Sequence, residues 1–534
     1  MGKRSRPNAE LIVFSLLNYK KIHQVKVRTR YAPSPTGYQH IGGIRTALFA
    51  YLFAKKHNGD LILRIEDTDQ KRYQAGAEEY IIESLKWLNV NPDEGVGFGG
   101  DHGPYRQSDR KAIYQEHVQK LIDGGHTYYA FDTPEELNAM RDRLSKAKSS
   151  VQQYNAVTRG DMRNSLTMSA DEVKAEMDKG TPYVIRIKLP ENENIVVTDL
   201  IRGNVTFNTN QMDDKVMMKG DGLPTYHLAN VVDDRTMAVT HVIRGDEWLS
   251  STPLHVFLYR CFGWEDQMPT FAHLPLMLSP DGNGKLSKRK GDKFGFPIFP
   301  LAYEDDRGET QPGYRELGYL PDAFTNFLMF QGWNPGTEQE IFSREELVNV
   351  FSLDRVTKAG TKFDIKKAQW FNAEHLRALD NETLTNLIWE GKPEDVNCDK
   401  EQLSSLVEMM KERMTFPNDF WEQADYLFAL PKEYDAKTVR KKWNDDNKGH
   451  LMTLKSELSG LEDYNSANIE TTIKSFIEDN GLSFGDILLP LRLMLTGVKG
   501  GPSVFDIAEF FGKEEVNKRF DIAAKTFDEM NAVV

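Results

Sequence analysis

The sequence predicts an α/β protein whose main domain is a doubly wound parallel (Rossmann-type) sheet. An inserted α+β domain splits this sheet, and an all-helical C-terminal part follows it. Three observations predict this fold: a strand–helix–strand unit near the N-terminus, a return to α/β character after a highly charged stretch, and helical periodicity in the C-terminal part. With 534 residues the chain is too long for one hydrophobic core, so we expect several domains.

The first α/β unit occupies residues 25–63. Apolar and polar side chains alternate over 25–31, as in a strand, and apolar residues recur at helical spacing over 44–56. The apolar run Leu61-Ile62-Leu63 suits a parallel strand that is buried on both faces. Doubly wound sheets bind their ligands at the carboxyl ends of the strands, so we expect a site there.

Residues 129–215 differ from what precedes them because they are highly charged. They include a predicted helix over 134–146 and a predicted strand over 183–189. We interpret this stretch as an inserted domain, which leaves 25–128 and 216–293 as the two parts of the sheet domain.

A strand over 241–244 and a helix over 252–262 resume the α/β pattern. A loop rich in Gly, Pro and Phe then spans 291–312. Beyond Glu374 the chain is predicted to be helical, because apolar residues repeatedly fall on one helix face. Two such sets are Leu403, Leu406, Val407 and Met410, and Ile469, Ile473, Phe476 and Ile477.

The composition is that of a globular protein, with 40% hydrophobic and 28% charged residues. It excludes a coiled-coil or largely disordered chain. Two cysteines, Cys261 and Cys398, cannot form a disulfide framework and lie too far apart in sequence to suggest a zinc site. The net charge of −13 argues against indiscriminate coating of nucleic acid, although a local basic surface can still bind RNA.

Residues 1–24 are interpreted as a disordered N-terminal extension. A basic start and a short apolar patch over 11–17 superficially resemble an export signal, but Ser15 breaks the patch and no small-residue cleavage site follows. No stretch approaches the roughly 20 apolar residues of a membrane span. We therefore expect a cytoplasmic protein that does not enter a membrane.

The first candidate motif is the turn over 32–37, followed by His40-Ile41-Gly42-Gly43 at a helix start. A helix N-terminus presents unpaired N–H groups and a positive dipole end, which together favour an anion. The glycines allow a ligand to approach the backbone, and the histidine can donate to a phosphate oxygen. Taken alone, the motif fits a glycine-rich connection with a capping histidine better than an anion site.

The second candidate motif is the basic segment 284–291, with four cations between two glycines: Lys285, Lys288, Arg289 and Lys290. A mobile loop of this kind can close over a polyphosphate, and a solvated basic loop is the alternative. The order of the motifs favours the polyphosphate. The histidine–glycine turn lies on the first strand–helix connection, and the basic segment follows the second half of the same sheet.

Together the two motifs closely resemble the His-Ile-Gly-His and Lys-Met-Ser-Lys-Ser sequences of class I aminoacyl-tRNA synthetases. Further stretches sharpen the resemblance to glutamyl-tRNA synthetases of the bacterial type, from residue 27 to near the C-terminus and most densely up to 289. These stretches are Arg-Tyr-Ala-Pro-Ser-Pro-Thr-Gly at 30–37, Arg-Ile-Glu-Asp-Thr-Asp at 64–69, Gly-Pro-Tyr-Arg-Gln-Ser at 103–108, Pro-Thr-Tyr-His-Leu-Ala-Asn at 224–230 and Ile-Arg-Gly-Asp-Glu-Trp at 243–248.

An amino acid with a side-chain carboxylate presents two anions and one ammonium. Arg30 and Arg244, each near a strand end, can hold carboxylates, and Glu66 can accept from the ammonium. Tyr226 and Asn230, one helical turn apart, can bind the remaining polar edges. The alternative is that Arg30 and Glu66 form only a buried ion pair between adjacent strands, which costs desolvation for little net stability.

The resemblance implies a set of site residues and ligands. The catalytic residues are expected to be His40, Lys285 and Lys288. ATP is expected to contact His40, Gly42, Gly43, Glu247, Leu278, Lys285, Ser287 and Lys288. The glutamate pocket is expected to comprise Arg30, Ala32, Ser34, Glu66, Tyr226, Asn230 and Arg244. The tRNA is expected to contact Arg413 and Arg492.

The resemblance also implies L-glutamate and tRNA(Glu) as partners, ATP as a substrate, Mg²⁺ as its companion and a monomeric protein. The inserted domain would bind the tRNA acceptor end, 294–373 would contact the tRNA stem, and 374–534 would bind the anticodon. Some relatives carry zinc in the inserted domain, but 128–132 has no cysteine here, so no zinc or other metal site is expected. The stretch 294–312 departs from the family pattern as an addition.

Three alternatives compete with this assignment. A glutaminyl-tRNA synthetase is disfavoured because the anticodon region of that family is β-barrel-like, whereas this tail is helical. The small paralogue that glutamylates a modified base lacks the C-terminal extension. An inactive RNA-binding paralogue is disfavoured by the intact His40, Glu66, Lys285 and Lys288. Forms that do or do not also charge tRNA(Gln) both fit the resemblance.

A further basic patch lies in the C-terminal part, at Lys437, Arg440, Lys441 and Lys442 beside Trp443. Cations next to an aromatic residue can bind RNA, and a solvated helix face explains the same pattern equally well. Arg492 lies in a mostly apolar stretch and can equally serve as an internal ion-pair partner. RNA contacts by these residues would make binding strongly dependent on salt.

Overall fold

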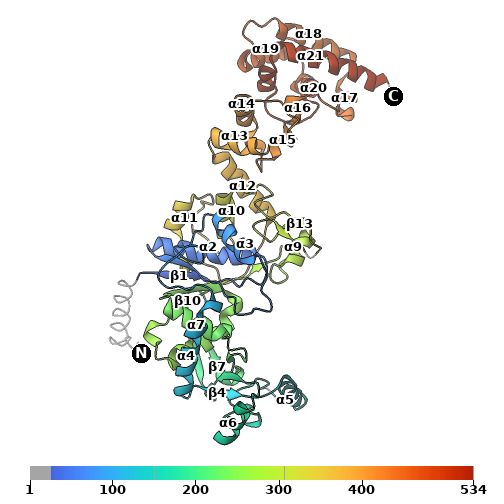
Figure 1. The fold of residues 1–534 in the computed structure, drawn as a ribbon. Helices are drawn as coiled ribbons and strands as arrows, with labels where there is room; N and C mark the ends of the chain where they lie inside the picture. Colours follow the sequence, from blue (N-terminus) through green and yellow to red (C-terminus); the bar gives the residue numbers. More distant parts are fainter. Residues whose placement is uncertain (1–25, 150, 306, 533–534) are drawn as a thin grey trace, which may run out of the picture. The chain divides into compact units, whose positions relative to one another are not determined.

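The computed structural model describes residues 26–149, 151–305 and 307–532 (Figure 1). The chain divides into two compact units, Met1–Ala368 and Gln369–Val534, which are taken in turn below. The extension predicted at 1–24 lies outside the described residues.

The first unit is built on a seven-stranded sheet with the order β3-β2-β1-β9-β10-β6-β7. The six strands from β3 to β6 pair in parallel, and β7 pairs antiparallel with β6 at one edge. This confirms the doubly wound parallel sheet. The strands are β1 (Arg28–Tyr31), β2 (Asp60–Leu63), β3 (Glu94–Gly95), β6 (Asn194–Asp199), β7 (Gly203–Asn208), β9 (His241–Gly245) and β10 (Thr270–Leu274).

The strand order changes direction at β1, which lies between β2 and β9 in the sheet. From β1 the chain moves through helix α2 (Ile41–Lys56) to β2 on one side, and β9 later pairs with β1 on the other side. Crossovers that leave one strand toward opposite sides open a crevice at its carboxyl end. The carboxyl ends of β1 and β9 and the start of α2 therefore border this crevice.

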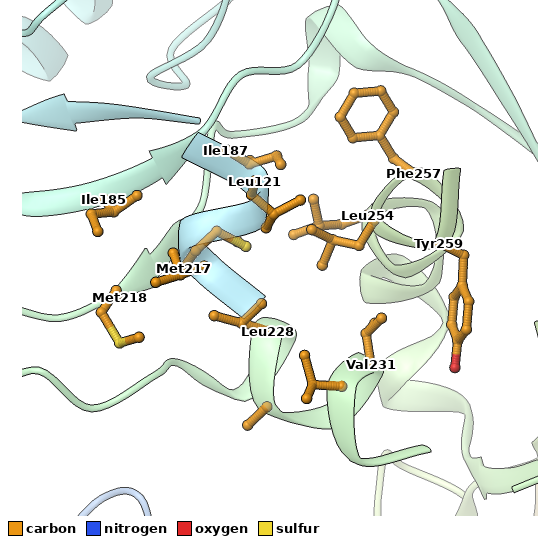
Figure 2. Close-up of a cluster of buried hydrophobic side chains, with 14 of the residues drawn as sticks. Leu121, Ile185, Ile187, Met217, Met218, Leu228, Val231, Leu254, Phe257 and Tyr259 are labelled. Atoms are coloured by element: carbon orange, nitrogen blue, oxygen red, sulfur yellow. The ribbon is translucent and has the colours of Figure 1, made fainter. Parts of the chain in front are cut away.

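A hydrophobic cluster joins the far half of the sheet domain to the insertion (Figure 2). It fixes α7 (Tyr226–Thr236), whose first turn borders the crevice, against α4 (Lys111–Asp123) and α8 (Thr252–Cys261). Burying a large aliphatic or aromatic side chain contributes about 1.5–3 kcal/mol, so the cluster gives α7 a rigid base. Its members include Leu121, Ile185, Ile187, Met217, Leu228, Leu254 and Phe257.

The insertion is less separate than the sequence predicts. Strands β4 (Thr127–Ala130), β5 (Val184–Ile187) and β8 (Val216–Met218) form their own antiparallel sheet, with α5 (Pro134–Lys146) and α6 (Ala170–Asp178) beside it in sequence. Strands β6 and β7, however, lie within 129–215 and belong to the main sheet. Every second side chain of β6 is buried, which gives it a face that the main sheet covers.

The segment after the sheet also differs from the predicted loops over 284–291 and 291–312. Helix α9 (Lys288–Phe294) begins inside the basic segment and ends at Gly295 in a left-handed conformation, with φ +74°. Position 291 inside this helix is a glycine because Phe296 and Ile298 pack closely against it. A Cβ there would lie 2.7 Å from atoms of both residues. The other elements are β11 (Met277–Leu278), β12 (Tyr303–Glu304), β13 (Thr310–Gln311), β14 (Thr361–Lys362), α3 (Ala77–Trp87), α10 (Pro321–Met329) and α11 (Arg344–Val350).

The second unit is helical throughout its described residues, as predicted. The two apolar sets predicted to share a helix face are buried on α14 and α19. No described helix has the length and apolar character that crossing a bilayer requires. The helices are α12 (Ile365–Ala378), in which the boundary between the units falls, α13 (Asn381–Glu390), α14 (Lys400–Met410), α15 (Asp419–Gln423), α16 (Asp425–Phe428), α17 (Ala436–Lys442), α18 (Asp445–Ser459), α19 (Ser466–Asp479), α20 (Phe484–Thr496) and α21 (Val504–Ala532).

Candidate active site

A pocket of about 610 Å³ lies at the carboxyl ends of β1 and β9, against the start of α2. Both motifs line it, the first through His40, Gly42 and Gly43 and the second through Lys285 and Leu286. The predicted residues that line it are Arg30, Ala32, Ser34, His40, Gly42, Gly43, Glu66, Tyr226, Asn230, Arg244, Glu247 and Lys285. The predicted residues Leu278, Ser287 and Lys288 are not part of its lining.

His40 is the N-cap of α2 and presents one ring nitrogen to the pocket wall. Its Nδ1 accepts from the backbone N–H of Gly42 at 2.9 Å, so the proton of the neutral ring sits on Nε2. Burial, together with the charges of Lys285 and Arg45, lowers the His40 pKa to about 4, so the ring is neutral at pH 7. Nε2 is buried and has no hydrogen-bond partner within the described part of the chain, which leaves a donor for a ligand oxygen.

The glycines after His40 keep the helix start open to the pocket. A Cβ on Gly43 would lie 3.0 Å from the Tyr31 hydroxyl and 1.8 Å from Nε2 of Gln39, so a side chain there requires movement. A Cβ on Gly42 would lie 3.2 Å from the His40 ring. Backbone N–H groups at this helix start can therefore be approached by an anionic ligand.

The basic segment enters the pocket through Lys285. Its ammonium lies 2.7 Å from Glu247 Oε1, and both side chains are substantially exposed, at 57% and 41%. Burial opposes ionisation of Glu247, but the hydrogen bond from Lys285 holds the Glu247 pKa below its ordinary value. An exposed ion pair of this kind is weak and can exchange its partner for a phosphate.

Lys288 lies at the start of α9 and outside the pocket lining. Its ammonium lies 5.6 Å from the centre of the Tyr303 ring, a cation–π distance. It lines a separate hollow of about 370 Å³ together with residues of the β12–β13 hairpin. The structure thus brings Lys285 to His40, whereas Lys288 contacts the 294–312 addition.

Arg244 is a buried positive charge of the pocket and has neutral hydrogen-bond partners. It donates to the Tyr226 hydroxyl at 2.7 Å, to Thr252 Oγ1 at 2.8 Å and to His273 Nε2 at 3.0 Å. It is only 4% exposed, and among the described residues no carboxylate forms an ion pair with it. A buried guanidinium without an anion is costly, so this position favours an anionic ligand.

Arg30 and Glu66 occupy the same end of the pocket, each with its own partner. Arg30 pairs with Asp234 at 3.2 Å, and Glu66 pairs with Arg64 at 3.1 Å. The Arg30–Glu66 ion pair considered as an alternative is therefore wrong. Asn230 donates to Glu66 Oε1 at 3.2 Å, as expected for residues that share a subsite.

The charge on Glu66 reflects opposing effects. Burial raises the Glu66 pKa, and the neighbouring Arg64 and Arg30 lower it in part. Asp234 is also buried, but Arg30 and Arg64 hold the Asp234 pKa below its ordinary value. The amino-acid end of the pocket is thus a network of buried charges rather than a single salt bridge.

Sequence reasoning missed several residues of this network. Asp234 holds both Arg30 and Arg64, and Trp248 lines the pocket and packs on the Tyr226 ring at 4.4 Å. Arg45 on α2 lines the pocket and donates to the carbonyls of Gln331 and Pro275 at 2.7 and 2.5 Å. The paired Asp233-Asp234 inside a helix was the available signal for buried partners of arginine.

In the second unit the structure brings Arg413 and Arg492 to one aromatic residue. The charges of both arginines partly offset the rise that burial causes in the Tyr426 pKa. Arg492 is half-buried on α20, and its Nη1 has no hydrogen-bond partner in the ranges that the structure describes, whereas Arg413 is exposed. The internal ion pair considered for Arg492 is not found among the described residues.

The basic patch on α17 fits the second of its two interpretations, a solvated helix face. Lys437, Arg440 and Lys441 are exposed, but Lys442 pairs with Asp486 at 2.7 Å. Trp443 is only 4% exposed and donates to Asp528 Oδ1 at 2.9 Å. The tryptophan is therefore part of the core and does not present a stacking surface.

Comparison with known proteins agrees with this site. The family described as class I tRNA synthetases (E and Q), catalytic domain, matches residues 26–370, and an anticodon-binding domain family matches 371–524. The chain is 52% identical to the glutamate–tRNA ligase of Phocaeicola vulgatus over 497 residues, which cover 92% of this chain and 97% of that protein. It is 50% identical to the glutamate–tRNA ligase of Cytophaga hutchinsonii over 507 residues, covering 94% and 98% of the two chains.

Solved structures give the same result. A glutamate tRNA ligase from Elizabethkingia meningosepticum, in complex with its amino acid, superposes with a TM-score of 0.88 at 45% identity and covers 94% of this chain and 100% of that one. A glutamate-tRNA synthetase from Elizabethkingia anophelis has a TM-score of 0.86 at 44% identity, with coverage of 94% and 100%. With its sheet, its two motifs and its relatives in agreement, the chain belongs to the class I tRNA synthetases of the E and Q family.

Proposed function

We propose that this protein is a glutamate–tRNA ligase that attaches L-glutamate to tRNA(Glu) in two steps. The observation that carries the proposal is Arg244, a buried guanidinium without a carboxylate partner among the described residues, in the pocket that both nucleotide-binding motifs enter. This combination suits an acidic amino acid next to a nucleotide. The high similarity to ligases named for glutamate supports the same substrate.

Glutamate would occupy the end of the pocket bounded by Arg30, Arg244 and Glu66. The two guanidinium groups would hold its carboxylates, and Glu66 would accept a hydrogen bond from its ammonium. Tyr226 and Asn230 already contact Arg244 and Glu66, so they would keep these groups in place. Ala32 and Ser34 line the same pocket and would border the bound amino acid.

ATP would lie over the start of α2, with its phosphates toward His40 and Lys285. In the first step an oxygen of the α-carboxylate forms a bond to the α-phosphorus, and the bond from that phosphorus to the pyrophosphate oxygen breaks. His40 Nε2–H, the helix N–H groups and Lys285 would stabilise the negative charge that grows on the phosphates. The step therefore depends on positioning and charge rather than on a covalent enzyme intermediate.

Lys288 must leave Tyr303 to take part in this step, because it does not line the pocket in this structure. A cation–π contact is worth about 0.5–2 kcal/mol, and Lys288 is only partly buried, so a phosphate can displace the contact. We therefore assign Lys288 a role on the departing phosphates after α9 moves. Glu247 would release Lys285 in the same event, and Leu278 and Ser287 would border the nucleotide.

In the second step the 2′-hydroxyl oxygen of the terminal adenosine of tRNA attacks the carbonyl carbon of the adenylate. The carbon–oxygen bond to AMP breaks, and the hydroxyl proton leaves with the AMP phosphate or solvent. The insertion would bind the acceptor end, residues 294–373 the stem, and the second unit the anticodon through Arg413 and Arg492. The protein would act as a monomer in the cytoplasm.

Mg²⁺ would arrive with ATP rather than in a site of the protein. The two carboxylates that line the pocket, Glu66 and Glu247, are already paired with Arg64 and Lys285. Across the described ranges no group of three or more His, Cys, Asp or Glu residues is arranged to hold a metal. These residues do not fit a resident metal, and no step is assigned to the ion.

Selectivity against glutamine follows from the buried arginines. An amide in place of the side-chain carboxylate leaves a guanidinium without its anion and brings an NH₂ group against donors. A pocket built for a polar partner rejects the wrong one by about 10⁴–10⁵-fold. Charging of glutamine at a comparable rate would show that the pocket is misassigned.

The test is aminoacylation of total tRNA with labelled glutamate and, separately, labelled glutamine. Pyrophosphate exchange is measured in parallel with and without tRNA, because the two conditions show whether activation of glutamate requires bound tRNA. We expect tRNA charging with glutamate alone. Charging with glutamine would favour the glutaminyl alternative, and no charging with either would favour an inactive paralogue.

A further inference from the structure

Three neighbouring strands carry a row of hydrogen-bonded side chains behind Arg244. His273 on β10 is the register partner of Arg244 on β9, so both side chains stand on the same face of the sheet. Asp199 ends β6, the next strand, which pairs with β10. Arg244 Nε lies 3.0 Å from His273 Nε2, and His273 Nδ1 lies 2.6 Å from Asp199 Oδ2.

The direction of every hydrogen bond in this row is determined by chemistry. A guanidinium can only donate, so His273 Nε2 must accept, and the imidazole proton must lie on Nδ1 and be donated to Asp199. The other carboxylate oxygen, Asp199 Oδ1, accepts from the backbone N–H groups of Ile201 and Arg202 at 2.9 and 2.8 Å. The carboxylate is therefore fixed at one end, and Arg244 at the other.

Thr252 completes the enclosure of the guanidinium. Its hydroxyl lies 2.8 Å from Arg244 Nη2 and 3.1 Å from His273 Nε2. Arg244, His273, Asp199 and Thr252 are all at most 4% exposed, so water does not compete for these bonds. Arg244 lines the pocket beside the Tyr226 hydroxyl, so a substrate carboxylate can approach it on that side.

A buried Asp–His pair can serve the core alone, and this is the competing interpretation. What separates the two is the charge of Arg244. No carboxylate pairs with Arg244 directly among the described residues, so the His273 link joins it to Asp199, the anion at the far end of the row. Buried charges need such compensation, and the compensating groups usually also set the geometry.

We propose that His273 and Asp199 are positioning residues that hold Arg244 in the orientation which binds and selects the glutamate carboxylate. His273 does so by accepting from Arg244 Nε, and Asp199 does so by holding His273 in the tautomer that can accept. This inference rests on the proposed function, because it assigns a role in the binding of glutamate. Neither residue touches the substrate.

Two substitutions at position 273 separate the positioning role from a role in packing. His273→Gln places an amide oxygen near the former Nε2, so Arg244 keeps an acceptor. His273→Asn keeps a donor toward Asp199 but does not reach Arg244. We expect His273→Asn to raise the KM for glutamate about 10- to 100-fold and His273→Gln to raise it about threefold or less, because hydrogen bonds to charged groups carry the larger share.

Asp199→Asn reverses the direction of the hydrogen bond to His273 and keeps the shape of the side chain. Its amide nitrogen would donate toward His273, which would move the imidazole proton to Nε2 and set it against the N–H of Arg244. We expect a rise of at least about tenfold in the KM for glutamate, with the KM for ATP unchanged within about twofold. Val242→Ala, a buried change on β9 outside the row, controls for loss of packing and should lower only the thermal midpoint.

The measurement is tRNA-dependent pyrophosphate exchange with glutamate and ATP varied in turn, together with thermal unfolding. The proposal is overturned if His273→Asn and His273→Gln change the KM for glutamate equally, or if the KM values for glutamate and ATP rise together as the protein is destabilised. Wild-type protein in the same assay distinguishes failure of the positioning role from failure of the proposed function. Failure of wild type to activate glutamate would instead overturn the proposed function.

Discussion

The two ends of the pocket are built in opposite ways. At the amino-acid end Arg30, Arg64 and Arg244 are at most 4% exposed, and each is held by buried partners. At the nucleotide end Lys285 and Glu247 form an exposed pair, and Lys288 rests against Tyr303 outside the pocket. The difference teaches that selection of a small acidic substrate uses fixed, desolvated charges, whereas handling a polyphosphate that must leave uses cations able to move.

The largest effect is expected when the fixed positive charge of Arg244 is removed from the amino-acid end. Arg244→Gln should lower kcat/KM for glutamate by about 10³-fold, because a carboxylate buried without its cation is heavily penalised. The KM for ATP should stay within about twofold of wild type. Pyrophosphate exchange with each substrate varied measures both values.

Arg72→Gln is the matched control for this change, since the Arg72 side chain is 73% exposed and its ion-pair partner among the described residues is Asp69. It removes the same charge from the surface of the same unit. Equal losses in the two variants would show that Arg244 acts through net charge rather than through contact with the substrate.

The next largest effect is expected from the mobile cation at the other end. Lys288→Ala should lower the rate of glutamate activation by roughly 10²–10³-fold while leaving the affinity for glutamate nearly intact, since its charge acts on the departing phosphates. Lys293→Ala, in the same helix with its side chain 64% exposed, should have little effect. Unchanged pyrophosphate exchange in Lys288→Ala would refute this role.

A smaller effect should follow from replacing the His40 donor while retaining its cap. His40→Asn keeps an acceptor for the Gly42 N–H but lacks the Nε2–H donor, so the activation rate should fall about 10- to 100-fold with the fold intact. His40→Ala loses both contacts and should in addition lose about 1 kcal/mol of stability. Activation kinetics and urea unfolding separate the two losses, and equal stability of the two variants would contradict the capping role.

The smallest predicted effect concerns the neutral state of His40. Burial lowers the pKa of His40 to about 4 in the folded protein. In the unfolded chain His40 is therefore protonated below about pH 6.5, whereas in the folded protein it is protonated only below about pH 4. The free energy of unfolding therefore falls as the pH drops from about 6.5 to about 4. Between pH 7 and pH 5 the protonation of His40 alone should lower the free energy of unfolding by about 2 kcal/mol.

Urea unfolding of wild type and His40→Asn at both pH values measures this contribution. The other buried histidines titrate in both proteins, so the difference between the two losses isolates His40. A loss as large in His40→Asn as in wild type would show that the His40 imidazole is already charged in the folded state.

Much of the candidate site could be predicted because its residues lie in short local patterns. The turn before α2, the basic segment at Lys285 and the one-turn spacing of Tyr226 and Asn230 all depend on near neighbours in the chain. The residues of the helical unit that face its core were also predictable, since the 3.6-residue period alone determines which face is apolar. The membership of β6 and β7 in the main sheet was not, because strand pairing joins distant segments.

The sequence by itself determined the first strand–helix–strand unit, the helical C-terminal part, the two motifs and the kinds of charge that meet in the pocket, since turn chemistry and periodicity act over a few residues. Only the tertiary structure decided which charge pairs with which. Arg30 meets Asp234, 204 residues away, rather than Glu66, and His273 and Asp199 come to stand behind Arg244. The physical reason is that a buried charge pairs with an opposite charge that lies next to it in space, and the order of the strands in the sheet determines which residues are adjacent.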